Sequence, residues 1–154
     1  MWRDATPGRP ERRSGVLLSA VLALGACDVL GGGATIQLDG QEVRLGRGAE
    51  VHDVMIGGSG ATDTLEPAAV SAAAGDALRF VAGDRRTHAL AFESEPLSPA
   101  AREFLESTLQ LRGPPLVNEG AAWVVSLADA PPGRYPFICR THGSRGVVTV
   151  EADD

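Results

Sequence analysis

The chain is short of several residue types, and each shortage excludes something. It has no lysine, so all 14 basic residues are arginines, and 20 acidic residues outnumber them for a net charge of -6. No stretch gathers the arginines into the basic surface that a nucleic-acid-binding protein presents, so we expect no nucleic-acid partner. Only two cysteines and two methionines occur among 154 residues. Sulfur ligands for metals and disulfide pairs are therefore few.

Long apolar runs are missing as well. The longest, VLLSAVLALGA, follows an arginine-containing start and is shorter than the roughly 20 apolar residues that a transmembrane helix needs. Such a run is typical of an export signal. It ends in Leu-Gly-Ala-Cys27, which resembles the bacterial lipobox, so we expect residues 1–26 to be a lipoprotein signal peptide and Cys27 to be lipidated. An ordinary cleaved signal is the alternative.

The rest of the chain divides into a linker and one domain. Residues 27–33 are glycine-rich and would separate the lipid from a folded domain at residues 34–154. Loss of residues 1–26 would remove four arginines and two acids, leaving 10 basic and 18 acidic residues and a net charge of -8. We therefore expect an acidic, exported domain anchored by lipid to the outer face of the bacterial cytoplasmic membrane.

The second cysteine, Cys139, would then be the remaining thiol of an exported chain. It cannot form an intramolecular disulfide if Cys27 carries lipid, although thiols in oxidising compartments normally pair. An unpaired thiol is a hazard there, which favours a metal thiolate. The alternative is a small buried hydrophobic residue.

Short apolar runs separated by turn residues fill the predicted domain. TIQL and EVRL flank Asp39-Gly40, a type I′ hairpin signal. Seven further runs predict strands: EVHDVMI, AAVSAA, ALRFVA, HALAF, AWVVSLA, RYPFIC and VVTVE. This pattern is typical of an antiparallel, all-β sandwich.

One segment has helical spacing. In LSPAAREFLESTLQL, residues 97–111, Ser98 is placed as an N-cap and Pro99 as the first helical residue. We expect one short helix inserted between strands and ended by Gly113 and the two prolines after it.

Three residues predict a metal centre. Because side chains alternate along a strand, His88 shares a face with the inward side chains of HALAF, and Cys139 with those of RYPFIC. His142 follows Cys139 by three residues in a glycine-containing turn, where the chain can fold back. Two imidazoles and a thiolate are the trigonal set that binds copper in electron-transfer sites.

Here the chain resembles the plastocyanin and azurin-like cupredoxins. The resemblance rests on AAVSAAAGDALRFVAGDRRTHALAF and PPGRYPFICRTHGSRGVVTV and covers roughly residues 49–151. It implies a Greek-key β-sandwich with one mononuclear copper held by His88, Cys139 and His142. It also implies a monomeric single-electron carrier of the blue-copper type that exchanges electrons with redox partner proteins and is not an enzyme.

The sequence departs from that family at the axial methionine. The corresponding position falls on Val147, and the loop after His142 is about two or three residues shorter than in that family. The family pattern gives no reason to place Met55, which lies in an early strand, at the copper. Val147 could leave a three-coordinate copper with a raised reduction potential. The Ser144 hydroxyl, the Thr87 carbonyl or a water could enter the loop instead. A third alternative is a domain for copper storage or delivery, or a copper-free protein-binding module.

Other sites are less favoured. A catalytic Cys-His pair needs a third, orienting group, structural zinc usually takes four protein ligands where three are evident, and a second metal has only His52 to spare. We interpret His52 as a partly exposed strand residue and Trp123 as core packing. Four arginines precede or flank the two histidine ligands, either as a docking surface for an acidic partner or as solvated loop residues: Arg85, Arg86, Arg140 and Arg145.

Overall fold

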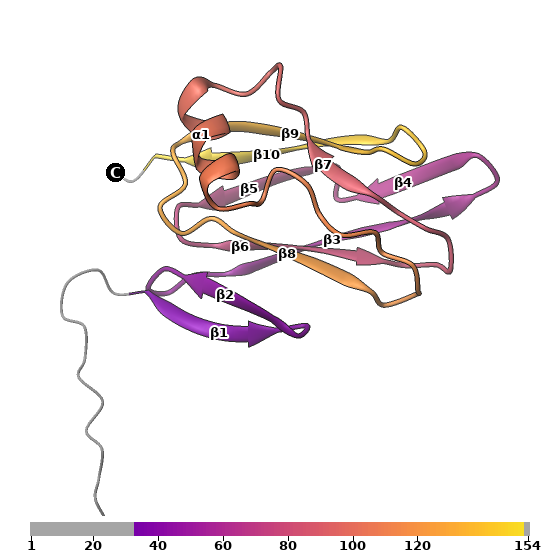
Figure 1. Cartoon of the computed structure of the whole chain (residues 1–154), viewed down its shortest axis with the longest axis horizontal. Helices are drawn as coiled ribbons and strands as arrows, with labels where there is room; N and C mark the ends of the chain where they lie inside the picture. Colours follow the sequence, from indigo (N-terminus) through magenta and orange to yellow (C-terminus); the bar gives the residue numbers. More distant parts are fainter. Residues whose placement is uncertain (1–32, 153–154) are drawn as a thin grey trace, which may run out of the picture.

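Strands with alternating buried side chains form two packed sheets in the computed structural model of the chain, which describes residues 33–152 (Figure 1). The first sheet, here the β9 sheet, has the order β5 (Ala69–Ala73), β10 (Arg145–Glu151), β9 (Gly133–Cys139) and β7 (Leu90–Phe92). The second, the β6 sheet, has the order β4 (Thr62–Glu66), β3 (Val51–Ser59), β6 (Ala77–Ala82) and β8 (Ala122–Ser126). The predicted all-β sandwich is confirmed.

The core lies between the two sheets and is rich in aromatic side chains. Phe80 of β6 stacks on Trp123 of β8 with ring centroids 5.3 Å apart, and it meets the edge of Phe137 of β9 at 5.0 Å. Tyr135, Phe137 and Cys139 alternate along β9 and are all fully buried. The interpretation of Trp123 as core packing is confirmed, and a rigid aromatic layer supports the end of β9 where Cys139 lies.

Two strand pairs contradict the prediction that the sandwich is antiparallel throughout. β3 runs parallel to β6, and β10 runs parallel to β5. A strand alternates its side chains in the same way whichever direction its neighbour runs, so the apolar pattern alone could not reveal this. Because β3 and β6 run parallel, their C-terminal ends lie at the same edge of the sandwich.

The first two strands form a hairpin of their own, β1 (Ala34–Leu38) with β2 (Gln41–Leu45). Asp39 and Gly40 both have positive φ, 49° and 76°, as a type I′ turn requires. Val43 and Leu45 of the hairpin form a separate small core with Ala77 and Val124 of the β6 sheet.

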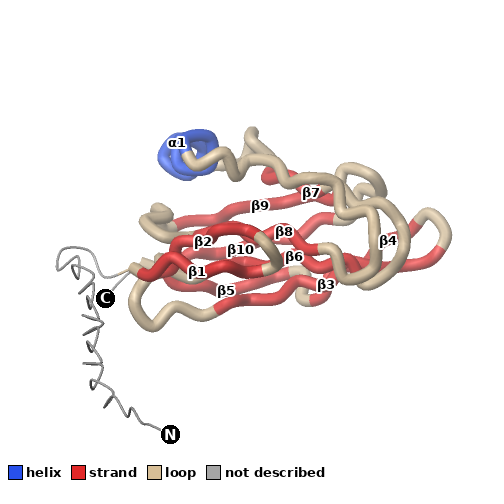
Figure 2. Tube along the Cα trace, turned by 60° about the horizontal axis from the view of Figure 1, so that its bottom comes forward, coloured by secondary structure: helices blue, strands red, loops and turns tan. Residues whose placement is uncertain are grey.

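The inserted helix, α1 (Pro99–Ser107), lies at one edge of the sandwich (Figure 2). Ser98 caps it by accepting a hydrogen bond from the N–H of Ala101, as predicted. The helix ends earlier than the predicted residue 111 because Leu109 takes a left-handed conformation with φ 57°. This nine-residue helix is too short to cross a membrane, and the described chain has no other candidate span. The predicted signal peptide and Cys27 lie outside the described residues.

Candidate metal centre

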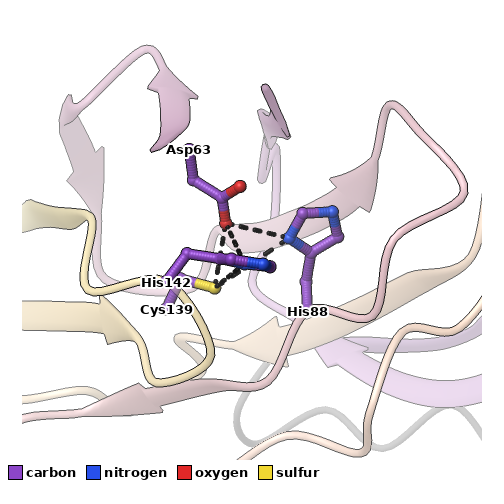
Figure 3. Close-up of side chains that lie close together, drawn as sticks. All are labelled: Asp63, His88, Cys139 and His142. Atoms are coloured by element: carbon purple, nitrogen blue, oxygen red, sulfur yellow. Dashed lines mark hydrogen bonds and ion pairs between the residues drawn. The ribbon is translucent and has the colours of Figure 1, made fainter. Parts of the chain in front are cut away.

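Four side chains from four separate segments meet at one end of the sandwich (Figure 3). Cys139 is the last residue of β9 and pairs with Leu90 of β7. His142 lies in the turn that joins β9 to β10. His88 precedes β7 and exchanges two backbone hydrogen bonds with Leu116, of 2.9 and 2.8 Å. The fourth side chain, Asp63, comes from β4, a strand that the sequence pattern did not predict.

The donor atoms of this group lie within 4.8 Å of one another. The sulfur of Cys139 is 3.9 Å from Nδ1 of His88 and 4.0 Å from Nδ1 of His142. Two ligands with ordinary metal–sulfur and metal–nitrogen bonds to one ion are about 3.6 to 3.8 Å apart. The structure therefore brings the three predicted residues together at nearly the spacing that a shared metal ion requires.

Asp63 is the residue that the sequence analysis missed. Its Oδ2 lies 2.8 Å from Nδ1 of His142, 3.1 Å from Nδ1 of His88 and 3.3 Å from the sulfur of Cys139. The side chains of Asp63 and His88 are fully buried, whereas that of His142 is 17% exposed. The reason for excluding structural zinc, that only three ligands were evident, is therefore wrong.

Asp63 and His88 belong to a ring of charged contacts. The Nε2 of His88 lies 2.8 Å from Oδ1 of Asp84, whose Oδ2 lies 3.3 Å from Nε of Arg86. Arg86 closes the ring by pairing through Nη2 with Oδ1 of Asp63. The ring leaves Nδ1 of His88 and Oδ2 of Asp63 directed at the centre of the group.

Electrostatics favour the forms of these groups that bind cations. Burial and the positive charge of Arg86 lower the pKa of His142, which keeps its imidazole neutral at neutral pH. Hydrogen bonds from the ring of His88 and the backbone N–H of Arg86 lower the pKa of Asp84. The thiolate of Cys139 and the carboxylate of Asp63 would repel each other if both were buried and charged. A cation bound between them removes this repulsion. The donor set therefore fits a metal ion.

The three axial candidates from the sequence are not among the four side chains that meet at this centre. Val147 pairs with Pro136 in the β10–β9 register, one position from the inward pair Val148–Tyr135, so it belongs to the face opposite Cys139. The placement of Val147 at the axial side is therefore corrected. Thr87, whose carbonyl was the candidate, is an exposed residue. Ser144 accepts a hydrogen bond from the N–H of Cys139 through its carbonyl, and its buried hydroxyl has no hydrogen-bond partner among the described residues.

The other candidates remain outside the group. Met55 is 44% exposed on β3, and His52 is partly exposed and bonds Asp76, not its neighbour Asp53. Of the four arginines, Arg86 reaches the centre. The remaining three lie at the surface: Arg140 exposed, Arg85 3.8 Å from Glu119, and Arg145 3.1 Å from Glu93.

Comparison with solved structures identifies the fold. The oxidised plastocyanin of Dryopteris crassirhizoma matches with a TM-score of 0.52 at 21% identity over 64% of this chain and 99% of that chain. The copper-containing nitrite reductase of Thermus scotoductus SA-01 matches with 0.51 at 18% identity, over 67% of this chain and 23% of that chain. A purple cupredoxin from Nitrosopumilus maritimus matches with a TM-score of 0.48 at 17% identity, over 65% of this chain and 99% of that chain. No protein-family model and no curated protein matches the sequence.

The two higher scores establish the fold. This chain has the cupredoxin fold, as the sequence resemblance implied.

Proposed function

We propose that this protein is a single-electron carrier that holds one copper ion through His88, Cys139 and His142. The observation that carries the proposal is the convergence of a fully buried thiol with two imidazole Nδ1 atoms, 3.9 and 4.0 Å away, at the end of a cupredoxin fold. Thiolate and imidazole ligands suit both oxidation states of copper. When bound, copper supplies a one-electron couple, Cu(II)/Cu(I), that takes an electron from a reduced partner protein and returns it to an oxidised one.

The chain holds two of these ligands rigidly. His88 is fixed by its pair of backbone hydrogen bonds with Leu116 and by the contact of Nε2 with Asp84. The N–H of Cys139 donates to the carbonyl of Ser144 at 2.8 Å. A pocket held in this way need not rearrange when the charge of its ion changes, and fast electron exchange depends on that small rearrangement.

The partners would dock where His142 reaches the surface. Its side chain is 17% exposed whereas that of His88 is fully buried, so the ring of His142 offers a short path for electrons. The exposed Arg85 and Arg140 could steer an acidic redox protein toward this end. Lipid on Cys27 would keep the protein, as an exported monomer, at the outer face of the cytoplasmic membrane.

A copper storage or delivery protein is the alternative function. Such a protein must release its ion to a receiver, which exposed ligands favour. Cys139 and His88 are both fully buried, and this burial favours an ion that stays bound while electrons pass.

The test is to add one equivalent of Cu(II) to the purified full-length protein and record the visible spectrum. We expect an intense thiolate-to-copper band, bleached by a reductant and restored by an oxidant. Replacement Cys139→Ser should abolish the band, whereas His52→Ala, which changes a histidine outside the group, should retain it. Absence of the band from the wild type at stoichiometric copper would refute the electron-carrier proposal.

A further inference from the structure

The two oxygens of Asp63 have different surroundings (Figure 3). Oδ2 faces the donor atoms of His88, Cys139 and His142 at 2.8 to 3.3 Å. Oδ1 faces away from them and pairs with the guanidinium of Arg86. One oxygen is thus anchored to the protein while the other is presented to the metal centre.

We propose that Asp63 is the fourth metal ligand of this centre, in place of the missing methionine, and that it shifts the centre's preference toward the more highly charged ion. This inference rests on the proposed function where it concerns copper. The role of Asp63 as a ligand can be tested with a second metal.

Local structure places Asp63 at the centre. β4 pairs with β3 so that Asp63 lies opposite Gly58, and alternation along β4 makes Asp63 its fully buried position, with exposed Thr62 and Thr64 on either side. A carboxylate buried to this degree is costly unless it is paired. Arg86 supplies one positive charge, and loss of the Cys139 proton would add another negative charge that a metal cation would balance.

Neighbouring residues hold the carboxylate in one orientation. Arg86 contacts Asp63 and Asp84 and also donates from Nη1 to the carbonyl of Gly60 at 2.7 Å. Asp84 in turn accepts a hydrogen bond from the N–H of Gly58 at 3.0 Å. Gly58 lies on β3 and Gly60 in the turn that follows it, so the hairpin that carries Asp63 also fixes Arg86 and Asp84. Ligands oriented by such outer contacts are typical of metal centres in proteins.

The charges set the direction of the effect on copper. The thiolate of Cys139 and the carboxylate of Asp63 together carry two negative charges, and those of Arg86 and Asp84 cancel. Cu(II) is then neutralised, whereas Cu(I) leaves one negative charge in a buried site. Asp63 should therefore favour Cu(II) and lower the reduction potential, the opposite of the raised potential expected for a three-coordinate centre with Val147.

The matched variants are Asp63→Asn and Asp76→Asn, since Asp76 is the other buried aspartate of the described chain. In the copper-loaded full-length protein, D63N should shift the visible band. It should also change the ratio of Cu(II) to Cu(I) affinity at least tenfold in favour of Cu(I). A tenfold change raises the reduction potential by about 59 mV for one electron. D76N should leave the band and the potential unchanged. An unchanged or lower potential in D63N would overturn the effect on copper.

Zn²⁺ tests the ligand role without redox chemistry. Zinc should bind the wild type with four protein ligands and D63N at least tenfold more weakly. The carboxylate infrared bands of the wild type should shift on zinc addition, a measurement that remains decisive if D63N does not fold. No carboxylate shift, together with equal zinc affinity in a folded D63N, would refute the ligand role. A zinc-dependent carboxylate shift without a copper–thiolate band would instead refute the electron carrier and retain Asp63 as a ligand.

Discussion

The two ends of the sandwich each contain a buried aspartate in contact with histidine, and the two pairs differ in what surrounds the carboxylate. Asp76 lies just before β6 begins, and its Oδ2 is 2.8 Å from Nε2 of His52. Asp63 lies at the other end, near the segment that follows β6, and its Oδ2 is 2.8 Å from Nδ1 of His142. The distances agree, yet the contacts indicate different roles.

Fixed backbone donors satisfy Asp76. Its Oδ1 accepts the N–H of Glu50 and its Oδ2 the N–H of Ala73, both at 2.8 Å. These bonds tie the starts of β3 and β6 to the end of β5. Asp63 instead meets a thiol and two imidazoles, all groups that can release a proton and bind a metal. A buried carboxylate held by backbone amides stabilises a fold, whereas one surrounded by side-chain donors indicates a site.

The sharpest test of this difference is metal-dependent stability. With free Zn²⁺ at 100 times its dissociation constant, the wild type should gain about 2.7 kcal/mol of unfolding free energy, because the ion binds the folded state alone. D76N should gain the same amount, and Cys139→Ser should lose most of the gain. Thermal unfolding with and without zinc measures these increments. A full gain in the Cys139→Ser variant would contradict the assignment of the metal centre.

A second test concerns the end of the sandwich that contains Asp76 and His52. Replacement Asp76→Asn should lower the unfolding free energy at pH 7 by roughly 1 to 3 kcal/mol, because an NH2 group, which cannot accept, replaces one of the two oxygens that accept backbone N–H groups. Urea unfolding of the metal-free protein measures it. The matched His52→Ala variant, which keeps the carboxylate and both backbone bonds, should lose less. A larger loss in H52A would mean that the histidine, and not the backbone, is the main partner of Asp76.

The contribution of Asp76 to stability should depend on pH. Burial alone would raise the pKa of Asp76, but hydrogen bonds from Glu50, His52 and Ala73 lower it below its ordinary value of 3.8. A lowered pKa stabilises the fold above that value, and the contribution is lost as the pH falls through the pKa of the folded state. The stability difference between wild type and D76N should therefore shrink below about pH 4. A constant difference from pH 7 to pH 3 would contradict this account of Asp76.

The sequence was most informative where residue types follow the alternation of a strand. RYPFIC predicted both β9 and the inward direction of Cys139, and Asp39-Gly40 predicted the first hairpin. His88 was placed correctly in the interior by the apolar side chains that share its face.

The strand β4 could not be found in this way. Its sequence, TDTLE, has a single apolar residue, and its most buried position is occupied by the charged Asp63. The alternation of Thr62 and Thr64 with Asp63 and Leu65 was a signal, because threonine favours strands. Nothing local relates Asp63 to Cys139, since 76 positions separate them. The fourth member of the centre therefore emerges only once the β3–β4 hairpin is folded.

The smallest expected effect tests whether the two ends are independent. Tyr135 lies near the start of β9 and donates from its hydroxyl to the carbonyl of Pro131 at 2.6 Å, and burial raises its pKa to about 12, so it remains a donor at neutral pH. Replacement Tyr135→Phe should cost about 1 kcal/mol of unfolding free energy. It should leave the copper–thiolate band in place, because the ring still packs and Cys139 lies at the other end of β9. Urea unfolding and the visible spectrum measure the two quantities. A shifted band would mean that β9 couples the two ends of the sandwich. Contacts at the end that contains Asp76 would then also affect the metal centre.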